Sequence, residues 1–176
     1  MIDNVDRLMR KFRDIAESVQ AENLGHTVGN QIKLVQREAR LLCPSDDGEL
    51  RRSIMTKVEE IQGGISATCY TNKKYGPYVE FGTGPKGEAS HEGISPDVTP
   101  AYSQRPWWIH ESQIDAEIAE KYGWFRLETK EGVFYQCTGQ AAQPFLYPAL
   151  KDNEERVTKN MNNYIKRKIK EAVKND

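Results

Sequence analysis

The sequence is short of cysteine. Only three of its 176 residues are cysteines, at positions 43, 69 and 137. They lie far apart, are odd in number and form no Cys-x-x-Cys pair. This pattern predicts neither a disulfide framework nor a zinc site. We therefore expect reduced thiols with a structural role.

Long apolar runs are also missing. No run approaches the about 20 residues that a membrane-spanning helix needs. The first residues, MIDNVDRLMRKFRD, lack the apolar core of a signal peptide. Lys and Arg number 25 and Asp and Glu 26, so the formal net charge of -1 disfavours general binding to polyanions. We expect no membrane partner and a protein that stays in the cytoplasm of the cell that makes it.

Motifs for catalysis, metals and nucleotides are absent as well. The sequence has no GxSxG, HExxH or GxxxxGK[ST] pattern. Its histidines, His26, His91 and His110, do not stand at a metal-ligand spacing. The stretch GTGPKG at 82–87 holds a lysine among glycines but lacks the Walker spacing, so a flexible loop is favoured over an anion site. We predict no catalytic residue, no metal and no cofactor.

What the sequence does contain is helical periodicity at both ends of one predicted domain. In the N-terminal part, 1–43, apolar residues recur at steps of three and four. Gly25 and Gly29 predict a break or kink within it. Pro44 ends the pattern, because its ring cannot continue a helix.

The C-terminal helical part is predicted over 144–174, with Pro144 near its start. From Arg156 onward the chain carries seven Lys or Arg against Glu171 and Asp176. Cations suit the negative end of a helix dipole. A nucleic-acid or partner-docking patch is the alternative interpretation.

Two pairs of strand-prone runs lie between these helices. Residues 53–59 and 65–71 flank a glycine pair, and residues 124–128 and 133–137 flank a turn that ends in glycine. Each pair predicts a hairpin. The predicted fold class is α+β, an antiparallel sheet of two hairpins packed by long N- and C-terminal helices.

Residues 82–121 are predicted to form a long loop or insertion. The polar, proline-containing part, 82–106, shows no periodicity, so we expect it to be mobile unless a partner orders it. The remainder, 107–121, has a rough apolar stripe that predicts a short helix. Two interpretations of Trp107 and Trp108 stay open: they anchor an interface, or they are buried against the protein's own sheet.

A single carboxylate, Glu80, stands among aromatic and aliphatic residues in YGPYVEFGTGP. Such a carboxylate can be a general acid, but glycosidases use two carboxylates and the sequence offers no obvious second one. Unpaired burial of a carboxylate costs several kcal/mol. We therefore favour an ion pair between Glu80 and Arg51 or Arg52.

Three segments in this order resemble one family. ARLLCPSDDGELRRSI (39–54) looks like a helix end followed by a Pro-x-Asp-x-Gly-x-Leu-Arg-x-Ser-Ile signature. YGPYVEFGTG (75–84) is close to Tyr-Ala-x-Tyr-Val-Glu-Phe-Gly-Thr, and GQAAQPFLYPAL (139–150) is close to Gln-x-Pro-Phe-Leu-x-Pro-Ala-Leu. Together they are similar to the tail-component family of HK97-like tailed phages, the gene-product-10-like proteins.

The resemblance implies a non-enzymatic virion protein, made in the bacterial host cytoplasm, that completes the tail or joins it to the head. It implies a ring subunit whose partners are other connector or tail proteins and further copies of itself. Transient contact with genomic DNA is a separate hypothesis, which rests on the basic C-terminal helix. The motif residues expected to serve the fold or assembly are Pro44, Asp46, Gly48, Leu50, Arg51, Ser53, Tyr78, Glu80, Gly82, Thr83, Pro144 and Phe145. Two alternatives stay open: a DNA-contacting protein that uses the basic C-terminal helix, and a small hydrolase centred on Glu80.

Overall fold

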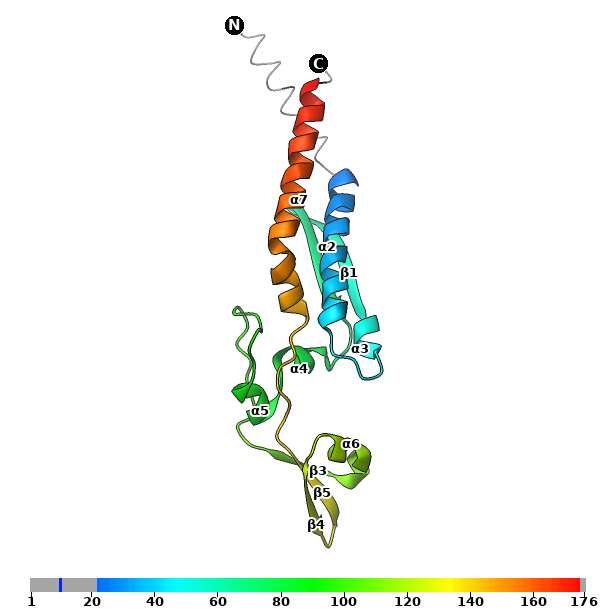
Figure 1. The fold of residues 1–176 in the computed structure, drawn as a ribbon, viewed down its shortest axis with the longest axis vertical. Helices are drawn as coiled ribbons and strands as arrows, with labels where there is room; N and C mark the ends of the chain where they lie inside the picture. Colours follow the sequence, from blue (N-terminus) through cyan, green and yellow to red (C-terminus); the bar gives the residue numbers. More distant parts are fainter. Residues whose placement is uncertain (1–9, 11–21, 175–176) are drawn as a thin grey trace. The chain divides into compact units, whose positions relative to one another are not determined.

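The computed structural model describes residue 10 and residues 22–174, which fall into two compact units (Figure 1). Unit 1 takes in the described residues up to Asn72 and those from Pro148 onward, and unit 2 is Lys73–Tyr147. Apart from Arg10, which is helical, the predicted helix over residues 1–21 lies outside the described residues. Each unit has its own sheet.

Helix α2 (Glu22–Leu42) supplies much of the core of unit 1. It ends at Leu42, as predicted from the following Pro44. It runs uninterrupted through both glycines at which the sequence predicted a break or kink. The buried side chains on its inner face recur at helical spacing: Ile32, Val35 and Ala39.

The first predicted hairpin is present and packs on α2. Strands β1 (Ile54–Ile61) and β2 (Gly64–Thr71) pair antiparallel, with a two-residue turn between Ile61 and Gly64. The two glycines of α2 face this hairpin. A Cβ atom on Gly25 would lie 3.7 Å from Ile65 Cδ1, and one on Gly29 would lie 3.8 Å from Val58 Cγ2.

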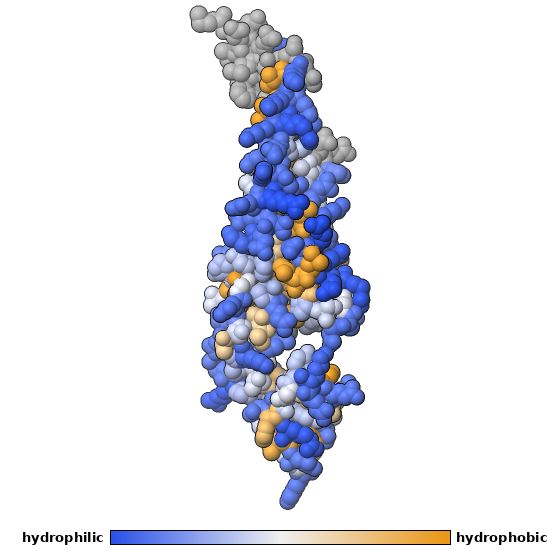
Figure 2. All heavy atoms as spheres, in the orientation of Figure 1, coloured by the Kyte–Doolittle hydropathy of each residue, from blue (hydrophilic) through white to orange (hydrophobic). Residues whose placement is uncertain are grey.

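Helix α7 (Leu146–Lys174) confirms the predicted C-terminal helix and runs beside α2 (Figure 1). The two helices are joined by a hydrogen bond from Asn160 Nδ2 to Gln31 Oε1, at 2.7 Å. Most side chains visible on α7 in Figure 2 are hydrophilic. Its buried residues are Ala149, Asn153 and Tyr164.

The second predicted hairpin forms in unit 2. Strands β4 (Phe125–Thr129) and β5 (Gly132–Cys137) pair antiparallel, and β3 (Trp107–His110) pairs with the other side of β5. One face of this three-stranded sheet is covered by α6 (Ala116–Lys121), whose Ala119 joins a buried cluster. The sheet residues of that cluster are Val133 and Tyr135.

Two predictions for these strands are wrong. The stretch 107–121 is not one helix, because Trp107–His110 is strand β3 and only a 3₁₀ turn (Glu111–Gln113) and α6 are helical. The two hairpins also do not join, and form separate sheets of two and three strands. The aromatic and β-branched residues of β3 favour a strand, and β3 pairs with the edge of β5 that β4 leaves free.

The predicted loop over 82–106 also contains regular structure, since Gly84–Ala89 forms helix α5. The irregular remainder is tied down within unit 2. Tyr102 Oη donates to the Phe81 carbonyl at 2.6 Å, and the Tyr102 ring stacks on His91. This segment is therefore anchored by contacts within the protein's own chain.

Candidate functional site

Glu80 lies in helix α4 (Gly76–Phe81) and is only 4% exposed. Its Oε2 accepts hydrogen bonds from the N–H groups of Phe145, at 2.8 Å, and Leu146, at 2.9 Å. Its Oε1 accepts from the N–H of Tyr147, at 3.0 Å. These three N–H groups stand at the start of α7, where no preceding helical carbonyl can accept from them.

The backbone therefore takes the place of the arginine that the sequence predicted as partner for Glu80. The predicted ion pair is wrong, and Arg51 Nη2 instead donates to the Cys43 carbonyl at 3.0 Å. A helix N-terminus carries partial positive charge, and N–H bonds to an ionised acceptor are strong. They satisfy the buried carboxylate without a cationic side chain, and both of its oxygens are in use.

The segment just after Glu80 pairs with the segment just before Phe145. Thr83 and Gln140 form an isolated antiparallel bridge, with N···O distances of 2.9 and 3.1 Å. The Gln140 side-chain amide also donates to the Tyr78 carbonyl at 2.8 Å. On either side of the bridge, the chain is fixed by bonds from Gln143 N to Val79 O, Ala142 N to Ser90 O and Lys86 N to Thr138 O. The second and third sequence motifs thus form one hydrogen-bonded assembly, which we call the motif junction (residues 76–90 and 138–147).

Glycines allow the two strands of the motif junction to approach closely. Gly82 and Gly139 have φ angles of +77° and +85°, which favour glycine. A Cβ on Gly82 would lie 2.7 Å from Ala142 N, and one on Gly139 would overlap the Thr83 carbonyl. Gly82 and Thr83, predicted to begin a moving loop, lie in this close backbone contact.

The first sequence motif lies in unit 1, where it turns the chain from α2 into β1. Gly48 adopts φ +78° before the short helix α3 (Glu49–Arg52), and Leu50 is the buried residue of that helix. Ser53 Oγ donates to the Leu50 carbonyl at 2.7 Å and lies 2.6 Å from Thr71 Oγ1. Half-buried Pro44 and exposed Asp46 complete this turn.

Three predicted site residues carry exposed aromatic rings. Tyr78 on α4 is 58% exposed, and Trp107 and Trp108 on β3 are 37% and 42% exposed. Trp107 Cζ3 lies 2.9 Å from the position of a Cβ on Gly84, so it borders the motif junction. Trp108 meets the ring of Phe125 edge-on at 6.2 Å. Neither tryptophan is fully buried, so the interface interpretation stays open for each.

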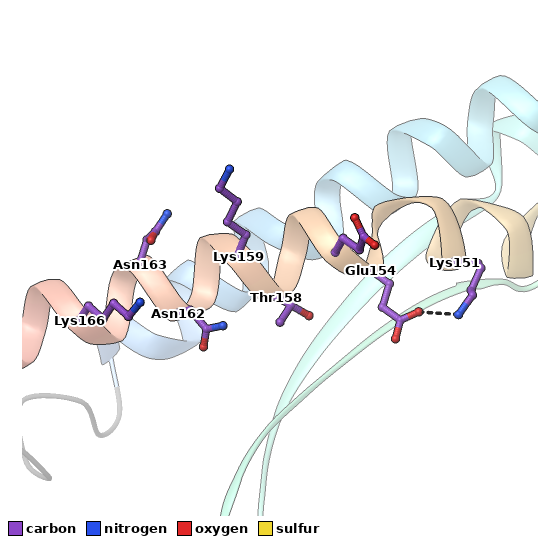
Figure 3. A pocket seen from close by; sticks show the side chains of 8 residues that line it. Lys151, Glu154, Thr158, Lys159, Asn162, Asn163 and Lys166 are labelled. Carbon is purple, nitrogen blue, oxygen red and sulfur yellow. Dashed lines mark hydrogen bonds and ion pairs between the residues drawn. The ribbon is translucent and has the colours of Figure 1, made fainter.

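The described residues offer little for catalysis. Among them no group of three or more His, Cys, Asp and Glu side chains could hold a metal, and no helix is long and apolar enough to cross a membrane. The hollow shown in Figure 3 is an open surface along α7, lined by eight polar residues of that one helix. Two of these, Lys151 and Glu154, form an ion pair at 2.8 Å. Charged, solvated side chains on one wall do not make a cleft for a small substrate.

Most Lys and Arg side chains in the basic C-terminal part of α7 are exposed. Glu171 binds two of them, Lys168 at 3.0 Å and Arg167 at 3.8 Å. The Arg167 guanidinium also lies over the ring of buried Tyr164. These contacts fit the interpretation that the basic part of α7 is a solvated helix end. Other cations on this helix remain exposed, where a partner could bind them.

Sequence reasoning missed Gln140 and Gly139. Both lie in the third motif segment, but neither was singled out, because a glycine–glutamine pair has no chemistry of its own in a sequence. Their contacts to Thr83 and Tyr78 span about 60 residues of chain. The sequence signal for this contact is the presence of Gly-Thr-Gly (82–84) in the second motif segment and Gly-Gln (139–140) in the third.

Comparison with known proteins supports the resemblance. Residues 1–82 match the model of the family described as "Bacteriophage HK97-gp10, putative tail-component". The match covers the first motif and most of the second, confirms the resemblance inferred from the motifs, and supports a phage tail-component role in general. No curated protein and no solved structure matches the chain.

Proposed function

We propose that the protein is a non-enzymatic component of a phage particle that completes the tail or joins it to the head, as a subunit of a ring. The family match over residues 1–82 supports the tail-component role. The observation that carries the non-enzymatic part is the state of Glu80. Its two oxygens accept three backbone N–H bonds in a site that is 4% exposed, so the one candidate carboxylate supports a helix start.

The predicted motif residues divide into two groups under this proposal. Glu80, Gly82, Thr83 and Phe145 hold the motif junction together and serve assembly only by keeping it rigid. Exposed aromatic rings are the side chains that most often dominate protein interfaces. Tyr78, Trp107 and Trp108 therefore contact neighbouring virion proteins.

The decisive experiment is electron microscopy of lysates from the parent phage with this gene deleted. We expect DNA-filled heads together with separate or abnormal tails. Wild-type protein supplied from a plasmid should restore joined, infectious particles. Normal particles from the deletion strain would remove the structural role.

The plasmid also allows a test of the contact residues. Tyr78→Ala removes an exposed ring, while the hydrogen bonds at this position use only backbone atoms: the carbonyl accepts from the Gln140 side chain, and the N–H donates to the Tyr75 carbonyl. Tyr122→Ala is the matched control, because Tyr122 is similarly exposed at 55% and lies outside the motifs. We expect the Tyr78 variant to be folded but to restore fewer particles than the Tyr122 variant. Equal rescue would exclude Tyr78 from the interface.

A second candidate, contact with the genome, is favoured by one observation on α7. Between Arg156 and Lys174 the helix carries seven cations, and Glu171 is the only acidic residue among them. Neutralising DNA phosphates releases counterions, so such contact would give a DNA affinity that falls steeply with salt. Replacing Lys166 and Lys170 with glutamine should then flatten the salt dependence. A binding curve that these changes do not alter would exclude this helix as the DNA contact.

A further inference from the structure

Strand β4 forms an open edge of the three-stranded sheet. It pairs with β5 on one side, and the described part of the chain supplies no strand on the other. All five of its residues are exposed. An unpaired edge presents a row of free N–H and C=O groups to another strand.

Side chains of β4 alternate between the two faces of the sheet. Arg126 and Glu128 stand opposite Tyr135 and Val133, on the face that α6 covers. Phe125 and Leu127 lie on the opposite face, together with Trp108. Phe125, Trp108 and Leu127 are 62%, 42% and 41% exposed, so the described chain leaves these three apolar side chains uncovered. Gln136 and His110 lie on the same face.

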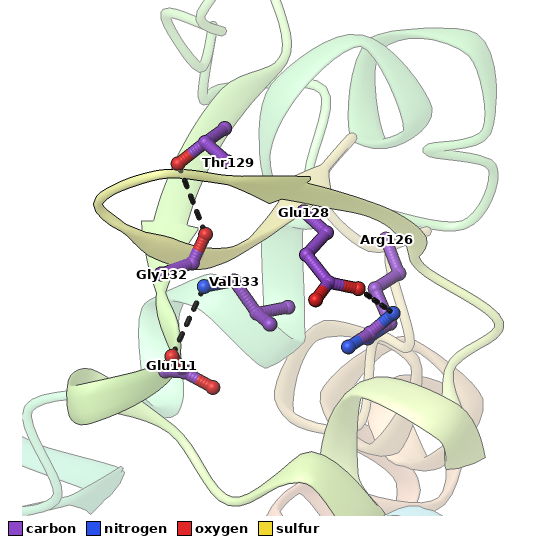
Figure 4. Close-up of polar contacts among 6 residues, drawn as sticks. All are labelled: Glu111, Arg126, Glu128, Thr129, Gly132 and Val133. Atoms are coloured by element: carbon purple, nitrogen blue, oxygen red, sulfur yellow. Dashed lines mark hydrogen bonds and ion pairs between the residues drawn. The ribbon is translucent and has the colours of Figure 1, made fainter.

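The charges on β4 are arranged symmetrically about Leu127. Arg126 precedes it and Glu128 follows it, and their side chains form an exposed ion pair at 3.2 Å (Figure 4). A two-fold axis through Leu127 would place Arg126 of one copy opposite Glu128 of the other, twice. Such self-complementarity is what a contact between two identical surfaces requires.

We propose that β4 pairs antiparallel with β4 of a second copy of this chain, about a two-fold axis at Leu127. The pairing makes a six-stranded sheet that continues across both copies. Leu127 meets Leu127 of the other copy on the apolar face, and Phe125 meets Thr129. Pairing replaces the Arg126–Glu128 ion pair within each copy by two such pairs between the copies. This replacement costs little free energy, because an ion pair whose side chains are 55% and 72% exposed contributes little to stability.

The same charges disfavour neighbouring registers. Antiparallel pairing centred on Arg126 or on Glu128 would set like charges directly opposite each other, which is unfavourable. Parallel pairing in register would place Arg126 beside Arg126 of the other copy. Edge charges often prevent non-specific strand pairing. Here they oppose these competing arrangements and favour the one centred on Leu127.

This inference does not depend on the proposed function. A two-fold contact closes after two copies and does not propagate around a ring. It is therefore a different contact from the ring interface, and it pairs subunits of the free protein. If β4 did not pair between copies, the proposed role in the tail would be unaffected. If the protein had no role in the tail, the pairing of β4 could still occur.

Charge exchange tests the pairing in solution. The mass of the full chain is measured by light scattering over a range of high micromolar concentrations. Arg126→Glu or Glu128→Arg alone places two like-charge pairs across the axis and should weaken the dimer by roughly tenfold or more. The double variant R126E/E128R restores opposite charges and should dimerise like the wild type. A wild-type chain that scatters light as a monomer over this concentration range, or a double variant that dimerises as weakly as the single variants, overturns the proposal.

Cysteine cross-linking tests the register. Leu127→Cys places a thiol next to its own copy at the axis, so mild oxidation should give a covalent dimer. Phe125→Cys is the matched control, because it is exposed on the same face but lies opposite Thr129 in this register. We expect cross-linking of the Leu127 variant alone. Cross-linking of both variants at equal rates, or of the Phe125 variant alone, overturns the register.

Discussion

The Glu80 carboxylate accepts a hydrogen bond of 2.8 Å from the backbone N–H of Phe145, which lies 65 residues further along the chain. This contact joins two short motifs that are separated by the whole of the three-stranded sheet. It also fixes where helix α7 begins, because the carboxylate binds the N–H groups of Leu146 and Tyr147 as well. Glu80 resembles a catalytic residue in the sequence, but in the structure its side chain caps the N-terminus of α7 from a distant segment of the chain.

Glu80→Gln should destabilise the protein. The amide carries no charge, and its NH₂ group would face backbone N–H donors that now meet a carboxylate oxygen. Hydrogen bonds to charged groups contribute about 1.5–3 kcal/mol each, and a buried donor left without an acceptor adds a penalty. We expect the free energy of unfolding in urea to fall by about 2–3 kcal/mol.

The control for this change is Glu155→Gln, the same chemical substitution at an exposed position on α7. It should change the free energy of unfolding by less than about 0.5 kcal/mol. If Glu80→Gln left stability unchanged and instead abolished a hydrolytic activity, the structural role of Glu80 would be refuted.

Much of the fold could be predicted from local patterns. Helical periodicity located the α2 core face and α7, and glycine-flanked runs located both hairpins, because these features depend on residues close in sequence. The partner of Glu80 could not be predicted this way. Backbone N–H groups occur at every residue except proline, so a sequence does not show which of them bind a carboxylate. It does show Arg51 and Arg52, and it therefore predicts an arginine partner.

Strand β3 shows the same limit. The run Trp107–His110 is short, and its apolar residues also fit one turn of helix, so spacing alone does not decide between them. Pairing with β5 decides it, and that contact depends on residues distant in the chain. The motif junction was missed for this reason too, since only the fold brings Thr83 to Gln140.

Gly139→Ala should disrupt the motif junction. Its φ of +85° is unfavourable for alanine, and the added Cβ would overlap the carbonyl of Thr83. Gly63→Ala separates the two effects, because Gly63 has φ +86° but nothing within 4 Å of its Cβ position. We expect a cost of about 1 kcal/mol at Gly63 and about 3 kcal/mol or more at Gly139, measured by urea unfolding. Equal losses at the two positions would show that the close approach of the two backbones is unimportant.

Gly29→Ala should stabilise the protein, although the residue faces the hairpin. Glycine within a helix costs about 0.5–1 kcal/mol relative to alanine. The added methyl group would lie 3.8 Å from Val58 Cγ2, an ordinary contact distance. We therefore expect the free energy of unfolding to rise by about 0.5–1 kcal/mol. A loss of stability would mean that α2 and β1 lie closer together in solution than this spacing.

The cysteines should resist modification until the protein unfolds. Cys43 and Cys137 are buried, and burial raises the pKa of Cys69 and Cys137, so few thiolates form near neutral pH. Arg40 partly offsets the rise in pKa at Cys69. A colorimetric disulfide reagent should therefore label the native protein slowly and label three thiols rapidly in urea. Rapid labelling of Cys43 or Cys137 in the native protein would contradict the burial.

The same burial predicts how stability depends on alkaline pH. Unfolded thiols titrate near their ordinary pKa of 9.0, and the folded pKa of Cys69 and of Cys137 lies above that value. Between these two pKa values the unfolded state releases protons that the native state keeps. The stability that the two buried thiols contribute is therefore fully present below pH 9.0 and is lost as the pH rises through the folded pKa. A variant with Cys69→Ala and Cys137→Ala should lose less stability than the wild type over the same alkaline range. Equal losses would assign the alkaline effect to tyrosine and lysine side chains, because those groups are unchanged in the variant.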